Sequence, residues 1–182
     1  MTLVLAGSIR ALRDWTAPPG PVAVVGSAAA FRGLDVALEE VRQELGDVDL
    51  EWYSATTRAD VEALSTVPEP AWWLLLEGSP LHARALWRHS ALSERWRLAP
   101  GPVVAIGTSS TVLGDVMVDP RGGAPTSGVG LFRGRVISLA LSESVETRTR
   151  QLLGTQNTLE ILSVDELLVI EESPELLLGD GD

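Results

Sequence analysis

Short apolar runs that end in glycine or small polar residues recur along this chain and constrain its fold more than any other feature. The clearest are Val22–Val25, Trp72–Leu76 and Val103–Ile106. Runs of this length without polar alternation are typical of parallel strands buried on both faces of a sheet. Between the first two runs, Phe31–Leu45 carries apolar residues at helical spacing and ends at Gly46. Strands that alternate with helices predict a parallel sheet between two helical layers.

The rest of the chain fits the same alternation. Further strands are predicted at Leu3–Leu5, Leu50–Tyr53, Arg135–Leu141, Leu159–Ser163, Leu167–Ile170 and Leu176–Leu178. Further helices are predicted after the N-caps Thr57 and Ser144, after Pro80, and around Leu92–Trp96. The closely spaced strands at the end predict a C-terminal β-hairpin. We therefore expect residues 1–182 to form one domain of the α/β class, a three-layer αβα sandwich with a mostly parallel sheet and this hairpin.

Composition excludes several classes of function. The chain has 25 acidic residues against 14 basic ones, a net charge of −11, which argues against nucleic-acid binding and anionic membranes. No run of about eighteen apolar residues predicts a transmembrane helix. The absence of cysteine excludes disulfides, thiolate metal sites and a cysteine nucleophile, and it fits a cytoplasmic protein. With His82 and His89 as the two histidines, we expect no metal centre and no cofactor.

The stretch with the clearest chemical signal follows the strand Val103–Ile106. It is a small polar cluster, Gly107–Thr111, after which apolar residues resume. A strand, a tight turn that carries serine and then a helix are the geometry of a nucleophile elbow. If Ser109 is the nucleophile, the β-branched Thr111 stands where an elbow requires a residue without bulk, so the match is imperfect.

Ligands of such sheets bind at the carboxyl ends of the strands, near a topological switch point. We expect three segments to converge there: Glu77–Pro80, Gly107–Thr111 and Ser138–Ser142. His82 follows the first of these segments closely. It is either a relocated general base or a partly exposed residue in the first turn of a helix.

Four motifs in order along the chain carry a resemblance to a known family. They are Leu76–His82, Gly107–Ser109, Leu113–Gly123 and Ser163–Glu166, and the most specific part is Met-Val-Asp-Pro-Arg-Gly-Gly at residues 117–123. The chain resembles the aspartyl dipeptidase and cyanophycinase-like serine peptidases of the class I glutamine-amidotransferase-like superfamily. The resemblance implies a flavodoxin-like sandwich and hydrolysis of small or acidic peptides by a serine, a histidine base, a carboxylate and a Gly-Gly oxyanion turn.

The resemblance assigns roles to individual residues, and several of the family's residues are replaced. Ser109 matches the nucleophile, although aligning backward from the Val-Leu-Gly-Asp at residues 112–115 places Gly107 there instead. Asp115 matches the triad carboxylate. The histidine position holds Leu139, and the Gly-Gly turn reads Glu77–Gly78. A serine without a base is barely nucleophilic, and a carboxylate at the oxyanion turn opposes the negative intermediate.

Two functional hypotheses follow. The first is a degenerate peptidase-like protein without efficient hydrolysis, whose pocket binds a small peptide, an amino-acid-like ligand or a protein partner, with a homodimer as a further prediction. In it, the Ser109 hydroxyl is a turn residue that caps a helix. The second is an active hydrolase with a rewired triad of Ser109 or Ser110 with His82. Arg121 is either an ordinary loop residue or a bidentate contact for a ligand carboxylate.

Overall fold

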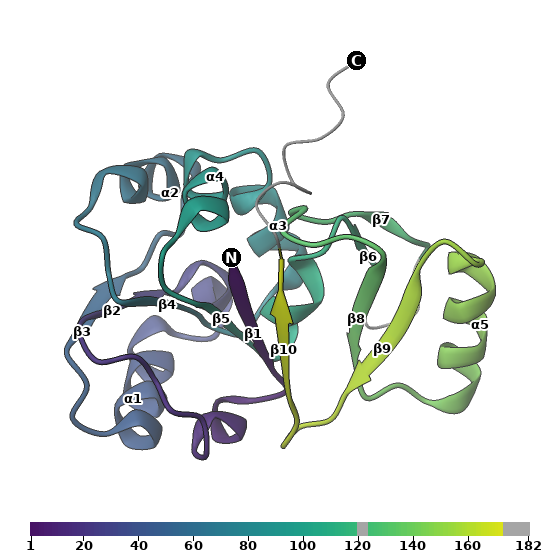
Figure 1. The fold of residues 1–182 in the computed structure, drawn as a ribbon, viewed down its shortest axis with the longest axis horizontal. Helices are drawn as coiled ribbons and strands as arrows, with labels where there is room; N and C mark the ends of the chain where they lie inside the picture. Colours follow the sequence, from purple (N-terminus) through teal and green to yellow (C-terminus); the bar gives the residue numbers. More distant parts are fainter. Residues whose placement is uncertain (120–123, 173–182) are drawn as a thin grey trace.

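A computed structural model describes residues 1–119 and 124–172 of the chain. A six-stranded sheet in the order β10-β1-β5-β4-β2-β3 forms its centre (Figure 1). The strands are β1 (Thr2–Ala6), β2 (Val22–Val25), β3 (Leu50–Tyr53), β4 (Trp72–Leu75), β5 (Val103–Ile106) and β10 (Leu167–Glu171). The first five are parallel, and β10 runs antiparallel to β1. The predicted mostly parallel sheet is confirmed.

Helices cover both faces of this sheet, which gives three layers (Figure 1). One face packs on α1 (Leu34–Leu45) and the 3₁₀ helix η1 (Ile9–Leu12). The other packs on a group of short helices: α2 (Arg58–Ala63), η3 (Leu64–Thr66), α3 (Pro80–Trp87) and α4 (Ala91–Leu98). No helix among the described residues is long and apolar enough to cross a membrane. The architecture is the α/β, flavodoxin-like sandwich.

Alternation along each strand explains the two layers. On β4, Trp73 and Leu75 belong to the core under the short helices, whereas Trp72 and Leu74 belong to the core under α1. All four are buried, which a strand covered on both faces requires. Trp73 also makes an edge-to-face contact with Trp96 of α4, with ring centroids 6.3 Å apart.

A smaller unit stands beside β10 (Figure 1). It contains the parallel pair β8 (Arg135–Leu139) and β9 (Thr158–Leu162), joined through α5 (Glu143–Leu153). The short antiparallel pair β6 (Val116–Met117) and β7 (Thr126–Ser127) precedes it. Leu153 of α5 packs with Val136 and Leu159 in a separate small core.

The predicted C-terminal hairpin is wrong for β9 and β10. The two strands are consecutive in the chain, yet β9 pairs with β8 and β10 pairs with β1. Pairing with β1 satisfies the backbone groups of what would otherwise be an open edge of the main sheet. Pairing with β8 buries the apolar face of β9 under α5. The predicted strand Leu176–Leu178 lies outside the described residues.

Candidate functional site

The chain turns sharply at Gly107, directly after β5. Gly107 is buried and has φ +54°, a left-handed conformation that favours glycine. It begins the 3₁₀ helix η4 (Gly107–Val112), so strand, turn and helix follow one another as the sequence predicts. In a nucleophile elbow the reactive side chain stands on the strained residue of such a turn. Here that position has no side chain.

Ser109 and Ser110 lie one turn further on, and both are fully buried. The Ser109 hydroxyl donates a hydrogen bond of 2.5 Å to the carbonyl of Leu76 at the end of β4. The Ser110 hydroxyl is 2.9 Å from the carbonyl of Ala105 and 3.2 Å from that of Ala6. The two hydroxyls therefore fasten η4 to the neighbouring strands.

His82 lies in the first turn of α3, as predicted. Its backbone N–H donates to the N-cap hydroxyl of Ser79 at 3.4 Å. Its imidazole contacts the ring of Phe31 edge-on, with centroids 5.0 Å apart. Within the described part of the chain, Nε2 of His82 is buried without a hydrogen-bond partner. The structure thus joins His82 to neither serine by a hydrogen bond.

The other predicted catalytic positions are not linked to the serines either. Oδ1 of Asp115 accepts a 2.9 Å hydrogen bond from the N–H of Val116, next to it in the chain. Leu139 ends β8 and packs partly buried against the main core, and β8 contacts η4. Arg121 lies outside the described residues. The carboxylate at 115 therefore acts locally on its own turn.

The loop after β4 is fastened tightly on two sides. The N–H of Gly78 donates to Oγ1 of Thr108 at 2.9 Å, and the Thr108 hydroxyl donates to the Gly78 carbonyl at 2.7 Å. A Cβ on Gly78 would lie 2.0 Å from the carbonyl oxygen of Ala28, in the 3₁₀ helix η2 (Ser27–Phe31), so only glycine fits. The amide that the resemblance assigns to the oxyanion turn is therefore bonded to Thr108.

Glu77 occupies the space over the Gly107 turn. A Cβ on Gly107 would lie 2.2 Å from Oε2 of Glu77 and 2.8 Å from its Cβ. Oε1 of Glu77 is held at 2.6 Å by Nη1 of Arg32, whose Nη2 lies 3.0 Å from Glu40 of α1. A three-residue ion network thus covers the strained turn.

A cavity of about 430 Å³ opens beside this network at the carboxyl edge of the sheet, and we refer to it as the edge cavity. Its polar lining comes from the segment after β1, from Arg32 after η2, from α1 and from the loop after β4. These polar residues include Ser8, Arg10, Arg32, Glu40, Glu44 and Glu77. The sequence prediction found Glu77 alone. The Glu40 and Glu44 pair, one helical turn apart on a charged face, was the available signal for α1.

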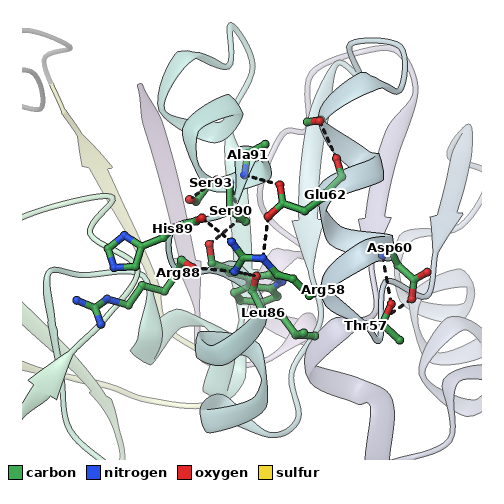
Figure 2. A network of polar contacts seen from close by, with 12 residues as sticks. Thr57, Arg58, Asp60, Glu62, Leu86, Arg88, His89, Ser90, Ala91 and Ser93 are labelled. Carbon is green, nitrogen blue, oxygen red and sulfur yellow. Dashed lines mark hydrogen bonds and ion pairs between the residues drawn. The ribbon is translucent and has the colours of Figure 1, made fainter.

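A second polar network lies between α2, α3 and α4 (Figure 2). The Arg58 guanidinium donates to the carbonyls of Leu86 and Arg88, each at 2.9 Å, and to that of His89. Glu62 accepts from Arg58 at 2.7 Å and from the N–H of Ala91 at 2.9 Å. The network closes the turn between α3 and α4, where His89 has φ +56°. Apart from the Arg58–Glu62 ion pair, the contacts of this network are with backbone groups, which indicates a structural role.

No group of three potential metal ligands is found among the residues that the structure describes. No protein-family model matches the chain, and the search of curated proteins found no match. Solved structures do match. A peptidase from an acI-B1 Actinobacterium aligns with TM-score 0.67 and 16% identity, over 93% of this chain and 82% of that one. This chain has a peptidase-like fold.

A putative peptidase E protein from Listeria monocytogenes EGD-e is similar as well. It aligns with TM-score 0.64 and 9% identity, over 94% of this chain and 98% of that one. At these identities the likeness concerns the fold, so any activity must be argued from the residues of this chain.

Proposed function

We propose that this chain is a non-hydrolytic protein on a peptidase fold, a degenerate relative of the aspartyl dipeptidase and cyanophycinase-like serine peptidases in the class I glutamine-amidotransferase-like superfamily. It binds a small amino-acid-like ligand in the edge cavity. The observation that carries the proposal is Gly107: the turn that would present a nucleophile presents no side chain, and the Glu77 carboxylate fills the space above it.

The chemistry of serine hydrolysis supports this proposal. The reaction needs an accessible hydroxyl, a base bonded to it and donors for the oxyanion. The Ser109 and Ser110 hydroxyls are buried and bonded to carbonyls. The Gly78 amide is bonded to Thr108. Removal of a single triad serine or histidine costs about 10⁶-fold in rate in a serine protease, and here several requirements fail together.

Labelling with a fluorophosphonate probe tests the proposal. We expect no labelling of the purified chain and no cleavage of aspartyl dipeptides, with an active serine hydrolase as the positive control. Ser109→Ala and Ser110→Ala are the matched variants. Labelling of the wild type that disappears in either variant, with the fold retained by circular dichroism, would overturn the proposal and favour the active-hydrolase alternative.

The cellular setting forms part of the same proposal. The cysteine-free sequence supports a cytoplasmic location, and a net charge of −11 disfavours nucleic-acid and anionic-membrane partners. A homodimer stays a prediction from the sequence. Light scattering on the purified chain would measure its mass in solution.

A further inference from the structure

We propose that the outer edge of β10 is a docking site for an extended segment of a partner protein that alternates apolar and basic residues. The site goes beyond the proposed function, since it shares no residue with the edge cavity. It combines an unpaired strand edge, an apolar groove beside that edge and a local excess of carboxylates. Together these features match the mode of recognition in which a peptide adds a strand to a sheet.

The backbone groups of every second residue in β10 face away from the sheet. β10 is an edge strand and pairs with β1 alone. The Met1 amino group donates to the Glu172 carbonyl at 2.8 Å, and the Glu172 N–H donates to the Met1 carbonyl at 2.9 Å. Because hydrogen-bonded positions alternate in an antiparallel pair, the even-numbered residues of β10 bond to β1. The N–H and C=O groups of Leu167, Val169 and Glu171 therefore face outward, and no other described strand pairs with them.

The sequence of β10 lacks the residues that normally discourage strand addition. Leu167–Glu171 contains no proline and no lysine. Its residues pair with β1 one to one, so no bulge twists the edge away. The side chain of Val169, at the centre of the strand, is 47% exposed. An edge of this kind is a template for another extended segment.

An apolar groove of about 270 Å³ lies between β10 and the β8–β9 pair, which stands beside β10 in Figure 1. Its lining combines four apolar side chains, Ile137, Ile161, Leu162 and Leu168, with two carboxylates, Glu160 and Glu166. The side chains of an added strand would alternate between the two faces of the sheet. Every second side chain would therefore lie on the same face as Leu168, where the groove accepts apolar groups.

The surroundings of this edge are acidic. From residue 151 to residue 182 the sequence has eight acidic residues and no arginine or lysine. Arg135 of β8 offsets Glu160, at 3.3 Å. Asp165, Glu166 and Glu171 form no ion pair within the described residues, although Glu166 and Glu171 accept hydrogen bonds from neutral groups. The carboxylates that flank the edge are therefore not neutralised.

Charge discriminates among the segments that could pair with the edge. A second copy of β10 would bring its own Glu171 and the neighbouring carboxylates to the interface. The sequence after Glu172 is also acidic, with Glu175, Asp180 and Asp182 and no cation. Like charges on adjacent strands are destabilising, whereas opposite charges across an interface favour encounter and fix register. Lysine or arginine in the partner segment thus complements the edge, and the two acidic segments do not.

Fluorescence anisotropy of labelled peptides on the full chain tests this site. We expect saturable binding of a peptide of alternating valine and lysine, and none of a peptide of alternating valine and glutamate at the same concentrations. A third peptide keeps the lysines but replaces the valines with proline, which cannot donate to a ladder. It should not bind, and this result separates strand addition from charge attraction alone.

Variants of the edge locate the binding. Val169→Pro removes an outward N–H without removing a hydrogen bond to β1, and we expect the peptide affinity to fall about tenfold or more. Val169→Thr keeps the N–H and the β-branched shape and should bind nearly as the wild type does. Glu166→Gln should weaken binding a few-fold, whereas Glu143→Gln on α5, exposed and away from the groove, should not. Amide hydrogen exchange should show new protection of Val169 and Glu171 when the peptide is bound.

Several results would overturn the proposal. They are binding of the valine–glutamate or the proline peptide as tight as that of the valine–lysine peptide, binding of no peptide, and equal affinity of Val169→Pro and wild type. Protection of the Val169 amide in the free protein would show that the edge is already paired, and this would overturn the proposal too. The pairing would be with a second copy if the protection depends on protein concentration, and within the chain if it does not. Hydrolysis is measured separately by the fluorophosphonate probe, so the failure of one proposal leaves the other standing.

Discussion

Substitution of Gly107 by alanine tests the geometry on which the functional proposal rests. A left-handed conformation at φ +54° costs a residue with a Cβ about 1–2 kcal/mol. The added Cβ would also lie 2.2 Å from Oε2 and 2.8 Å from Cβ of Glu77, and overpacking of this kind typically costs about 1–3 kcal/mol. Disturbing the half-exposed Arg32–Glu77 ion pair adds little to this cost in stability. We expect Gly107→Ala to lower the free energy of unfolding by about 2–5 kcal/mol.

A double-mutant cycle isolates the contact with Glu77. Glu77→Gly removes both the carboxylate and the Cβ that the new methyl group would meet, so Gly107→Ala in that background should cost only the backbone strain of about 1–2 kcal/mol. Equilibrium unfolding in urea of the wild type, both single variants and the double variant measures both values. A cost of less than 0.5 kcal/mol for Gly107→Ala, or the same cost with and without Glu77, would refute the placement of this turn.

Two further predictions concern other parts of the molecule. Arg58→Ala removes the donor to three carbonyls at the end of α3. Because the Arg58 side chain is 42% exposed, we expect the free energy of unfolding to fall by only about 1–2 kcal/mol. Arg58→Lys should recover part of this loss, because an ammonium lacks the planar fork of a guanidinium. Thermal unfolding measures both, and equal stability of Arg58→Ala and wild type would contradict the structural role. Burial raises the pKa of Tyr53, and the hydrogen bond from its hydroxyl to Glu51 is the second cause. The stabilising contribution of Tyr53 is therefore complete below the unfolded pKa of about 10 and is lost as the pH rises through the higher folded pKa. Tyr53 is the one tyrosine of the chain, so the absorbance of tyrosinate at about 295 nm reports its ionisation alone. A titration midpoint of the native protein at or below that of the urea-unfolded chain would contradict this prediction.

Local sequence patterns predicted the elements well because their causes are local. The N-cap Thr57 forms the expected capping box with Asp60, with hydrogen bonds of 3.0 and 3.2 Å. The helix predicted from Phe31 begins instead at Leu34, because Gly33 at φ +88° interrupts the chain after η2. The N-cap predicted at Ser144 is Ser142. These differences of two or three residues leave the layers of the fold unchanged.

The pairing of the strands could not be predicted from local sequence patterns, because it depends on contacts between segments that are distant in the chain. The spacing of the runs at residues 159–163 and 167–170 equally suits a hairpin and two strands in separate sheets. The choice is made by the open edge of β1, more than 160 residues away in the chain, where Thr2 pairs with Glu171. The edge cavity escaped prediction for the same reason, since Ser8, Arg32 and Glu77 come from three separate strand–helix junctions.

The residues at positions 77 and 107 constrain each other, and this coupling explains why the site cannot be converted to a nucleophile elbow by one substitution. A serine at 107 would carry its Cβ into the carboxylate of Glu77, 2.2 Å away, and would take a strained backbone conformation as well. A glycine at 77 would open the space but leave Arg32 with Glu40 alone. Glycine at the turn and a paired carboxylate above it are thus each favourable only in the presence of the other. The same pairing that closes the turn to a nucleophile also holds Glu77 at the wall of the edge cavity.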